Sequence, residues 1–265
     1  MRFKRDIAMA VNLSLSLSSR CAIVQNQILR SLVPESFDRL RPYLEPVALK
    51  RRAILQEHNR PVEYIHFIEH GVASLFARTH RDGPVEVAVV GRLGFVGVPA
   101  VIGTMRSPHR CMMEVAGEAM RIRAREMRRI MEGSCAIRQQ LLNYVHLLLI
   151  QNMQMALCNV RHGLNERLCR WLLLASDRLD DKFVPLTHEQ LSMILGVRRA
   201  GITTTLSDLE GAGAVKKSRG AVEIADRAVL ECRTCECYRI IAAEYRRLTS
   251  SSSYQHLIDL PVIDP

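Results

Sequence analysis

The stretch RRAGITT brings two arginines, an alanine and two threonines within seven positions. If it is helical, Arg199 and Thr203 share one face, as do Ala200 and Thr204, because residues four apart lie one above the other. Arginine can donate two hydrogen bonds to guanine O6 and N7, threonine can bond a base edge or a phosphate, and alanine can contact a thymine methyl. We expect Arg199 to read a base, and Arg198 to contact a phosphate or to remain a surface charge.

A second basic cluster follows in KKSRGAVEIAD, where Gly220 marks a turn between two short strands. Lys216, Lys217 and Arg219 would meet phosphates there, which provides salt-dependent affinity without sequence choice. This hairpin is typical of the wing of a winged helix. The alternative interpretation of the cluster is a solvated turn.

Three closely spaced thiols, Cys232, Cys235 and Cys237, form a further candidate site in CRTCEC. Such thiols can bind zinc or be oxidised, but a C-x-C step is not the usual zinc spacing and no obvious fourth ligand is present. The sequence therefore predicts no metal site, and packing or incidental oxidation is the favoured interpretation. The eight cysteines are scattered along the chain rather than spaced as in a disulfide framework, which indicates reduced thiols and a cytoplasmic protein.

Two short helices must position the helix face that carries Arg199 and Thr203, which we call the arginine face. Thr187 begins the first helix, and Gln190 three residues later completes a capping box. Gly196 ends it, because the left-handed conformation that terminates a helix is cheapest for glycine. With NERLCRWLLL upstream, the two helices make a three-helix core. Residues 187–209 therefore predict a helix-turn-helix, whose second helix faces the DNA major groove, and Thr187 and His188 are among the expected DNA contacts.

One long helix is predicted over residues 134–160, with Ser134 as its N-cap and no proline or glycine inside it. A heptad seam along it favours pairing with a second copy of the chain, and Asn152 within the seam would fix the register. The seam residues are Leu141, Val145, Leu148, Asn152 and Met155. Since the helix is apolar nearly all round, it could instead pack on its own chain, and both interpretations can hold together.

Short runs punctuated by glycine precede the long helix, among them VEYIHFIEHG, VASLFARTHRDG, PVEVAVVGRLG, CMMEVAG and EAMRIRA. Each predicts a strand of its own closed by a turn, and together they indicate a jelly-roll-like β-roll. The chain is thus α+β in class. Its expected parts are a flexible tail over 1–24, the β-roll sensor domain over 25–133, the dimerisation helix over 134–160, the winged helix-turn-helix domain over 161–236, and a C-terminal helix and tail over 237–265.

The charge of the chain favours an acidic partner such as DNA. Lys and Arg number 37 against 27 Asp and Glu, which gives a net charge of +10 and a pI near 9.5. The first residues resemble a signal peptide, but Asn12 and alternating serines dilute the apolar stretch, and Met9 is an alternative start. No run reaches the roughly 20 apolar residues of a membrane-spanning helix, so no membrane partner is expected.

The order of roll, long helix and winged helix resembles the Crp/Fnr family of bacterial transcription regulators, over roughly residues 25–235. The most specific segments are YIHFIEHGVASLF, RLCRWLLLASDRL, LTHEQLSMILGVRRAGITTTLSDLEGAGAV and the SRG turn. The resemblance implies a homodimer that binds double-stranded DNA, with RNA polymerase as a further candidate partner. Oxygen-sensing members carry an N-terminal cysteine cluster, whereas this chain has only Cys21 there, so an iron-sulfur cluster is not expected.

The resemblance also implies an effector pocket in the roll. Well-known members hold cyclic AMP with a Gly-Glu step and a following Arg-Ser, and here Gly97 matches the glycine while Val98 stands at the glutamate position. A ribose hydroxyl thereby loses its acceptor, so the usual mode of cyclic AMP binding is not expected and the effector is unknown. The pocket residues implied are Gly94, Gly97, Val98, Pro99, Arg106, Ser107 and Arg110.

These features favour a DNA-binding regulator whose roll biases the spacing of two recognition helices. The alternative is a sensor or scaffold module that binds another protein through its winged helix, because fold does not fix function. An enzyme is not expected, since the sequence has no Gly-rich phosphate loop with lysine, no zinc-protease spacing and no nucleophile elbow.

Overall fold

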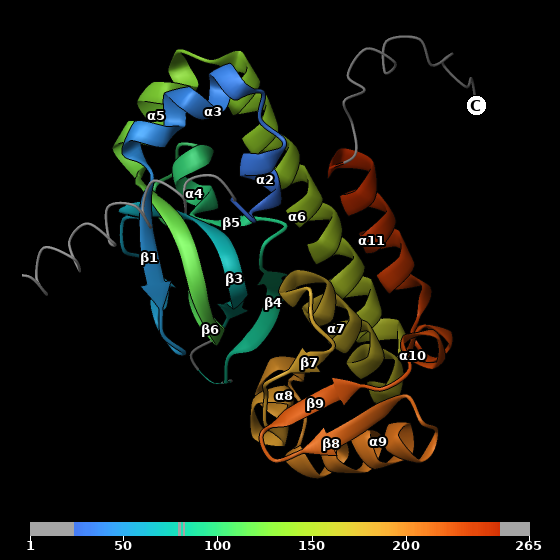
Figure 1. The fold of residues 1–265 in the computed structure, drawn as a ribbon. Helices are drawn as coiled ribbons and strands as arrows, with labels where there is room; N and C mark the ends of the chain where they lie inside the picture. Colours follow the sequence, from blue (N-terminus) through green and yellow to red (C-terminus); the bar gives the residue numbers. More distant parts are fainter. Residues whose placement is uncertain (1–23, 79–80, 82, 250–265) are drawn as a thin grey trace, which may run out of the picture.

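A long helix, α6 (Cys135–Arg161), runs along a β-rich half of the chain and continues to a helical half (Figure 1). The computed structural model describes residues 24–78, 81 and 83–249. Ser134 caps α6 by accepting a hydrogen bond from the Ile137 amide at 3.4 Å. None of the helices in the described ranges is both long and apolar enough to cross a membrane.

The β-rich half is an antiparallel sheet in the order β1-β6-β3-β4, with β2 paired to β6 and β5 paired to β3. Its strands are β1 (Glu45–Leu49), β2 (Ile54–Gln56), β3 (Tyr64–Ala77), β4 (Val85–Val90), β5 (Phe95–Val96) and β6 (Arg110–Arg123). Short helices surround it, namely α2 (Gln27–Arg30), α3 (Pro34–Leu40), η1 (Arg41–Tyr43), α4 (Val98–Val101) and α5 (Ala124–Glu132). This is the roll that the glycine-punctuated runs predicted.

The five glycine-punctuated runs form only three of the strands, β3, β4 and β6, because two glycines lie inside strands. Gly71 has φ +92° and sits within β3, where the register with β6 shifts between His70 and Val72. A Cβ at Gly71 would lie 2.7 Å from the Val115 carbonyl oxygen, so the glycine permits a close crossing of two strands and not a chain reversal. Gly117 has the same role inside β6.

The helical half forms a three-helix core with a small sheet. Its elements are α7 (Leu164–Leu179), β7 (Phe183–Val184), α8 (His188–Leu195), α9 (Arg199–Gly211), β8 (Val215–Ser218), β9 (Ala221–Ile224), α10 (Arg227–Arg233) and α11 (Glu236–Thr249). The Thr187 capping box with Gln190 is present, and Gly196 ends α8 with φ +66° in the left-handed region. The side chains of Ile202, Leu206 and Leu209 point into the core.

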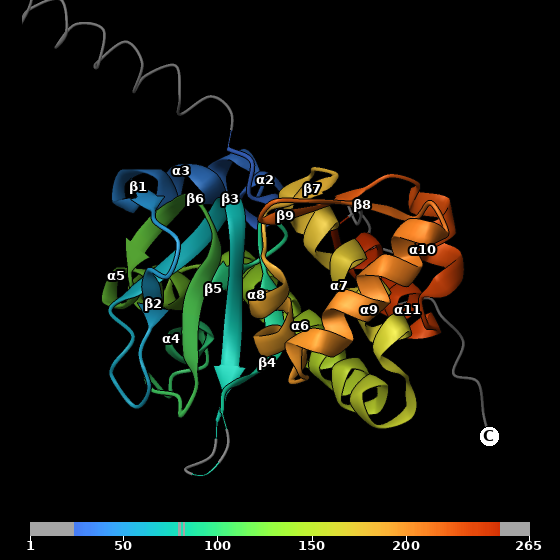
Figure 2. The same cartoon turned by 90° about the horizontal axis from the view of Figure 1, so that it is seen from below.

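The two halves share one apolar core, because α7 packs against both. Nearly every residue of α7 from Leu168 to Ser176 is buried, and the helix contacts β3 and β4 on one side and α9 and α10 on the other. Figure 2 shows the helical half beside the roll, where α8 contacts β4. Along α6, the C-terminal helix α11 lies on the side away from the roll (Figure 1).

Candidate nucleic-acid interface

The start of α9 presents the arginine face to solvent. Arg198, Arg199, Ala200, Thr203 and Thr204 are all exposed, although α9 itself is anchored by a buried apolar side. Arg198 is the N-cap residue and Arg199 the first residue of the helix, so both lie at the positive end of the helix dipole. This end of a helix suits a phosphate backbone, while the following turn is positioned to meet base edges.

His188 orients one of these side chains. Its Nδ1 lies 3.0 Å from Thr203 Oγ1, and the same hydroxyl donates to the Arg199 carbonyl oxygen at 3.1 Å. Burial, with Arg199 and Lys217 nearby, lowers the pKa of His188, so a neutral imidazole donates to Thr203 near neutral pH. The Thr203 oxygen then keeps one lone pair for an incoming donor. The Thr187 hydroxyl is engaged with Gln190 in the predicted capping box.

The hairpin of β8 and β9 carries the second basic cluster. Lys216 and Arg219 are exposed. Lys217 is half-buried, forms an ion pair with Glu210 at 2.8 Å and donates to Ser207 Oγ at 2.9 Å. Lys217 therefore ties the hairpin to α9, whereas Lys216 and Arg219 remain available to phosphates.

The predicted pairing seam on α6 faces the interior of its own chain. Leu141, Leu148 and Met155 are only 2%, 9% and 5% exposed, and Val145 and Asn152 are half-buried, so these side chains pack within their own chain. A second heptad pattern is exposed throughout, and Met153 and Val160 in it are 66% and 82% exposed. This exposed stripe consists of Leu142, His146, Leu149, Met153, Ala156 and Val160. Its alternating steps of four and three suit a paired helix.

The predicted effector residues differ in their exposure to solvent. Gly94, Gly97 and Pro99 are buried, Val98 and Ser107 are half-buried, and Arg106 and Arg110 are exposed. Val98 begins α4 after Gly97, so an apolar side chain occupies the position where a ribose would need a carboxylate. Arg110 is held by Glu57 at 2.9 Å, and Gly94 lies so close to Tyr144 that a Cβ would be 2.3 Å from the ring.

A cavity of about 710 Å³ lies elsewhere on the roll, beside β1, β3 and β6. None of the seven predicted effector residues lines it. Its polar lining includes Glu69, His70, Glu118 and Arg41. Burial raises the pKa of Glu69, although its carboxylate accepts hydrogen bonds from the Gln25 and Asn26 amides.

Buried polar contacts join the roll to the helical half. The indole nitrogen of Trp171 donates to Glu86 at 2.7 Å, and Ser74 donates to the other oxygen of the same carboxyl group. The Arg178 guanidinium donates to the Val89 carbonyl oxygen at 2.9 Å. Because Glu86 is completely buried, its desolvation raises its pKa from 4.5 to about 7.

We expect the replacement Glu86→Gln to remove part of the pH dependence of stability. A carboxyl whose pKa is raised on folding stabilises the fold most fully below pH 4.5, and this contribution is lost as the pH rises through about 7. Wild-type protein should therefore lose roughly 3 kcal/mol more than the variant between about pH 5 and pH 8. Denaturant unfolding at the two pH values measures this difference. Glu132→Gln, an exposed substitution of equal charge, should behave as wild type, and parallel curves for wild type and Glu86→Gln would contradict the assignment.

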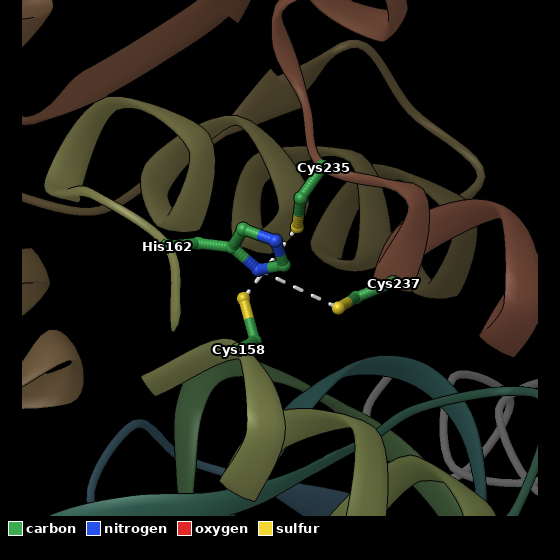
Figure 3. Close-up of side chains that lie close together, drawn as sticks. All are labelled: Cys158, His162, Cys235 and Cys237. Atoms are coloured by element: carbon green, nitrogen blue, oxygen red, sulfur yellow. Dashed lines mark hydrogen bonds between the residues drawn. The ribbon is translucent and has the colours of Figure 1, made fainter. Parts of the chain in front are cut away.

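Two of the three C-terminal thiols lie in a cluster that the sequence did not predict (Figure 3). Cys235 and Cys237 converge with Cys158 and His162 from the end of α6, whereas Cys232 is exposed and lies outside the group. The Cys158 and Cys235 sulfur atoms are 3.5 Å apart although 77 residues separate them in the chain. No local sequence pattern could reveal ligands that only tertiary folding brings together.

Two family models match the chain, each over one half of the fold. A cyclic nucleotide-binding domain matches residues 46–134, and a Crp-like helix-turn-helix domain matches residues 166–233. These matches correspond to the roll and to the helical half that contains α8 and α9. No curated protein matches the chain.

Solved structures of regulators share the fold. A transcriptional regulator of the Crp/Fnr family from Eubacterium rectale is 17% identical, covers 79% of this chain and 96% of its own, and has a TM-score of 0.60. The c-di-GMP-responsive regulator CLP from Xanthomonas campestris is 14% identical, with coverages of 73% and 100% and a TM-score of 0.59. FixK2 from Bradyrhizobium japonicum is 13% identical, with coverages of 72% and 98% and a TM-score of 0.60.

Proposed function

Because the chain belongs to the Crp/Fnr family of DNA-binding transcription regulators, we propose that it acts as a homodimer on a near-palindromic DNA site. The observation that carries this proposal is the exposed polar face at the start of α9, on a helix whose other side is firmly buried. Regulation then follows from helping or blocking RNA polymerase at the bound site, in the cytoplasm where genomic DNA lies.

The exposed side chains at the start of α9 would recognise particular bases through hydrogen bonds. Arg199 would donate two hydrogen bonds to guanine O6 and N7 in the major groove. Thr203 uses its hydroxyl hydrogen within the protein, so towards DNA it would accept from an adenine or cytosine amino group. Lys216 and Arg219 on the hairpin would contact phosphates and position the helix without adding sequence choice.

Pairing along the exposed stripe of α6 accounts for an apolar surface that a lone chain would leave in water. Two copies of α6 would bury Leu149 and Met153 against each other, and the helices would set the distance between the two reading faces. The half-sites should then lie about 34 Å apart, one turn of the DNA helix.

Through its contact with the helical half, the roll could change the position of α9. A change in the roll at β4 would act on α7 through Glu86 and Val89. A change at β6 would act on α8 through the hydrogen bond from Gln190 to Glu114 at 3.4 Å. An effector of the roll would regulate DNA affinity if it favoured one arrangement of this contact over another.

Selection of binding sites from random duplex DNA tests the proposal directly. The reduced, full-length protein should enrich a near-palindrome with guanine at the position facing Arg199, and its affinity should fall steeply with salt. A platform for another protein has no reason to show that salt dependence. Absence of any enriched site, together with flat salt dependence, would refute DNA reading by α9.

A further inference from the structure

Four soft metal ligands converge where α6 ends and α11 begins. Three are thiols and one is an imidazole, and their ligand atoms all lie within 4.8 Å of one another (Figure 3). The three thiols are buried and the imidazole is half-buried. This thiol-imidazole cluster consists of Cys158, His162, Cys235 and Cys237. From it we propose that the chain binds one zinc ion in a closed, tetrahedral Cys3His site.

The separations within the cluster suit a single ion. Zinc-sulfur bonds of about 2.3 Å and zinc-nitrogen bonds of about 2.0 Å place tetrahedral ligand atoms roughly 3.5–3.8 Å apart. The Cys158 and Cys235 sulfurs are 3.5 Å apart, and the Cys237 sulfur lies 3.7 Å from His162 Nδ1. A disulfide needs sulfur atoms at about 2.05 Å, so the Cys158–Cys235 pair has the spacing of shared ligands and not of a bond. A tetrahedral set of thiolate and imidazole ligands favours zinc over Mg²⁺ and Ca²⁺, which prefer oxygen ligands.

Local structure directs all four side chains inward. Cys158 and His162 are four residues apart at the end of α6 and therefore share one helix face. Cys235 immediately precedes α11 and Cys237 is its second residue, so both thiols lie at the positive end of that helix.

A buried cation balances the charge that the site would carry. Three thiolates and one zinc ion sum to one negative charge. Arg170 on α7 is 1% exposed, and its Nε and Nη1 atoms have no hydrogen-bond partner among the described residues. The guanidinium is near enough for its charge to act on the Cys158 thiol. Buried guanidinium N–H groups without acceptors are costly, and an anionic metal site beside them would offset part of that cost.

A zinc ion at this position would stabilise the arrangement of the surrounding helices. It would cross-link the last turn of α6 and the chain turn before α7 to the junction of α10 and α11. The helix α6 carries the proposed pairing surface, and α10 packs on α7, which in turn contacts the reading helix α9. A bound ion would therefore fix the helical half at the end of α6.

The test is zinc content of the purified full-length chain, followed by cobalt substitution. Protein prepared with reductant and without chelator should contain one zinc per chain by elemental analysis. After removal of the zinc, added Co²⁺ should give the visible absorption of a tetrahedral ion and a sulfur-to-metal charge-transfer band. Cys158→Ser and Cys235→Ser should each lose at least about 100-fold in zinc affinity, because even partners outside the ligand shell change it by about 10–100-fold.

Cys232→Ser is the matched control, since it removes an exposed thiol of the same CRTCEC segment and should bind zinc as wild type does. The wild-type cobalt spectrum decides the matter if a ligand variant fails to fold. Wild-type protein that contains no zinc, a cobalt spectrum without thiolate ligation, or a Cys158–Cys235 disulfide in reduced preparations would overturn the proposal.

Discussion

Protein carrying Arg199→Ala together with Thr203→Ala should lose sequence-specific DNA binding and remain a dimer. Each dimer loses two arginine contacts to guanine and two threonine contacts, and a good bidentate contact discriminates by about 1–3 kcal/mol. The affinity for the selected palindrome should therefore fall by about a thousandfold or more, towards the non-specific level. Fluorescence anisotropy with the selected duplex and a scrambled duplex measures this loss.

Arg239→Ala serves as the control for this double variant, because it removes one exposed positive charge from α11 and leaves the α9 face intact. It should change the affinity for both duplexes slightly and equally. If the double variant still preferred the selected duplex as strongly as wild type, another surface would have to read the bases.

Protein carrying Leu149→Glu and Met153→Glu should be monomeric. In a pair of α6 helices these positions face their counterparts, so the substitution buries four like charges in the dimer contact. Each buried, unpaired charge is costly, and the dissociation constant of the dimer should rise by at least about a thousandfold. Gel filtration with light scattering gives the mass, and the affinity for the palindrome should fall because only one half-site is engaged at a time.

Asn159→Glu distinguishes the two heptad frames on α6. Asn159 lies four residues after Met155, where the frame that the sequence favoured continues, and one residue away from the exposed stripe, so the variant adds an exposed carboxylate in that frame. We expect it to remain dimeric. A monomeric Asn159→Glu protein alongside a dimeric Leu149→Glu, Met153→Glu protein would restore the frame through Leu141 and Leu148.

Local signals made the helix-turn-helix predictable from the sequence. The Thr187 capping box, the left-handed Gly196 and the inward Ile202 each depend on residues within one turn of each other, and the structure contains all three. The long helix was predictable for the same reason, since Ser134 and the absence of helix breakers act locally. The resemblance to the Crp/Fnr family added the order of the parts, which the two family models match.

The remaining errors come from contacts between distant parts of the chain. A helix that is apolar nearly all round offers two heptad frames, and only the roll and α11 decide which frame is buried. Gly71 looked like a turn because the crossing strand is 44 residues away at Val115. The thiol-imidazole cluster was missed because Cys158 and His162 lie far from CRTCEC in sequence.

Because α7 is buried on both sides, any change in how the two halves pack is an equilibrium between a docked state and a state in which they separate. Any state in which the helical half leaves the roll exposes Trp171 to water and breaks its bond to Glu86. A ligand that shifts such an equilibrium from 1:99 to 99:1 must prefer one state about 10⁴-fold. The proton on Glu86, whose pKa moves from 4.5 to about 7, can supply at most a few hundredfold of that preference. Acidity can thus bias the docked population, but a complete switch requires a ligand that discriminates between the two states far more strongly.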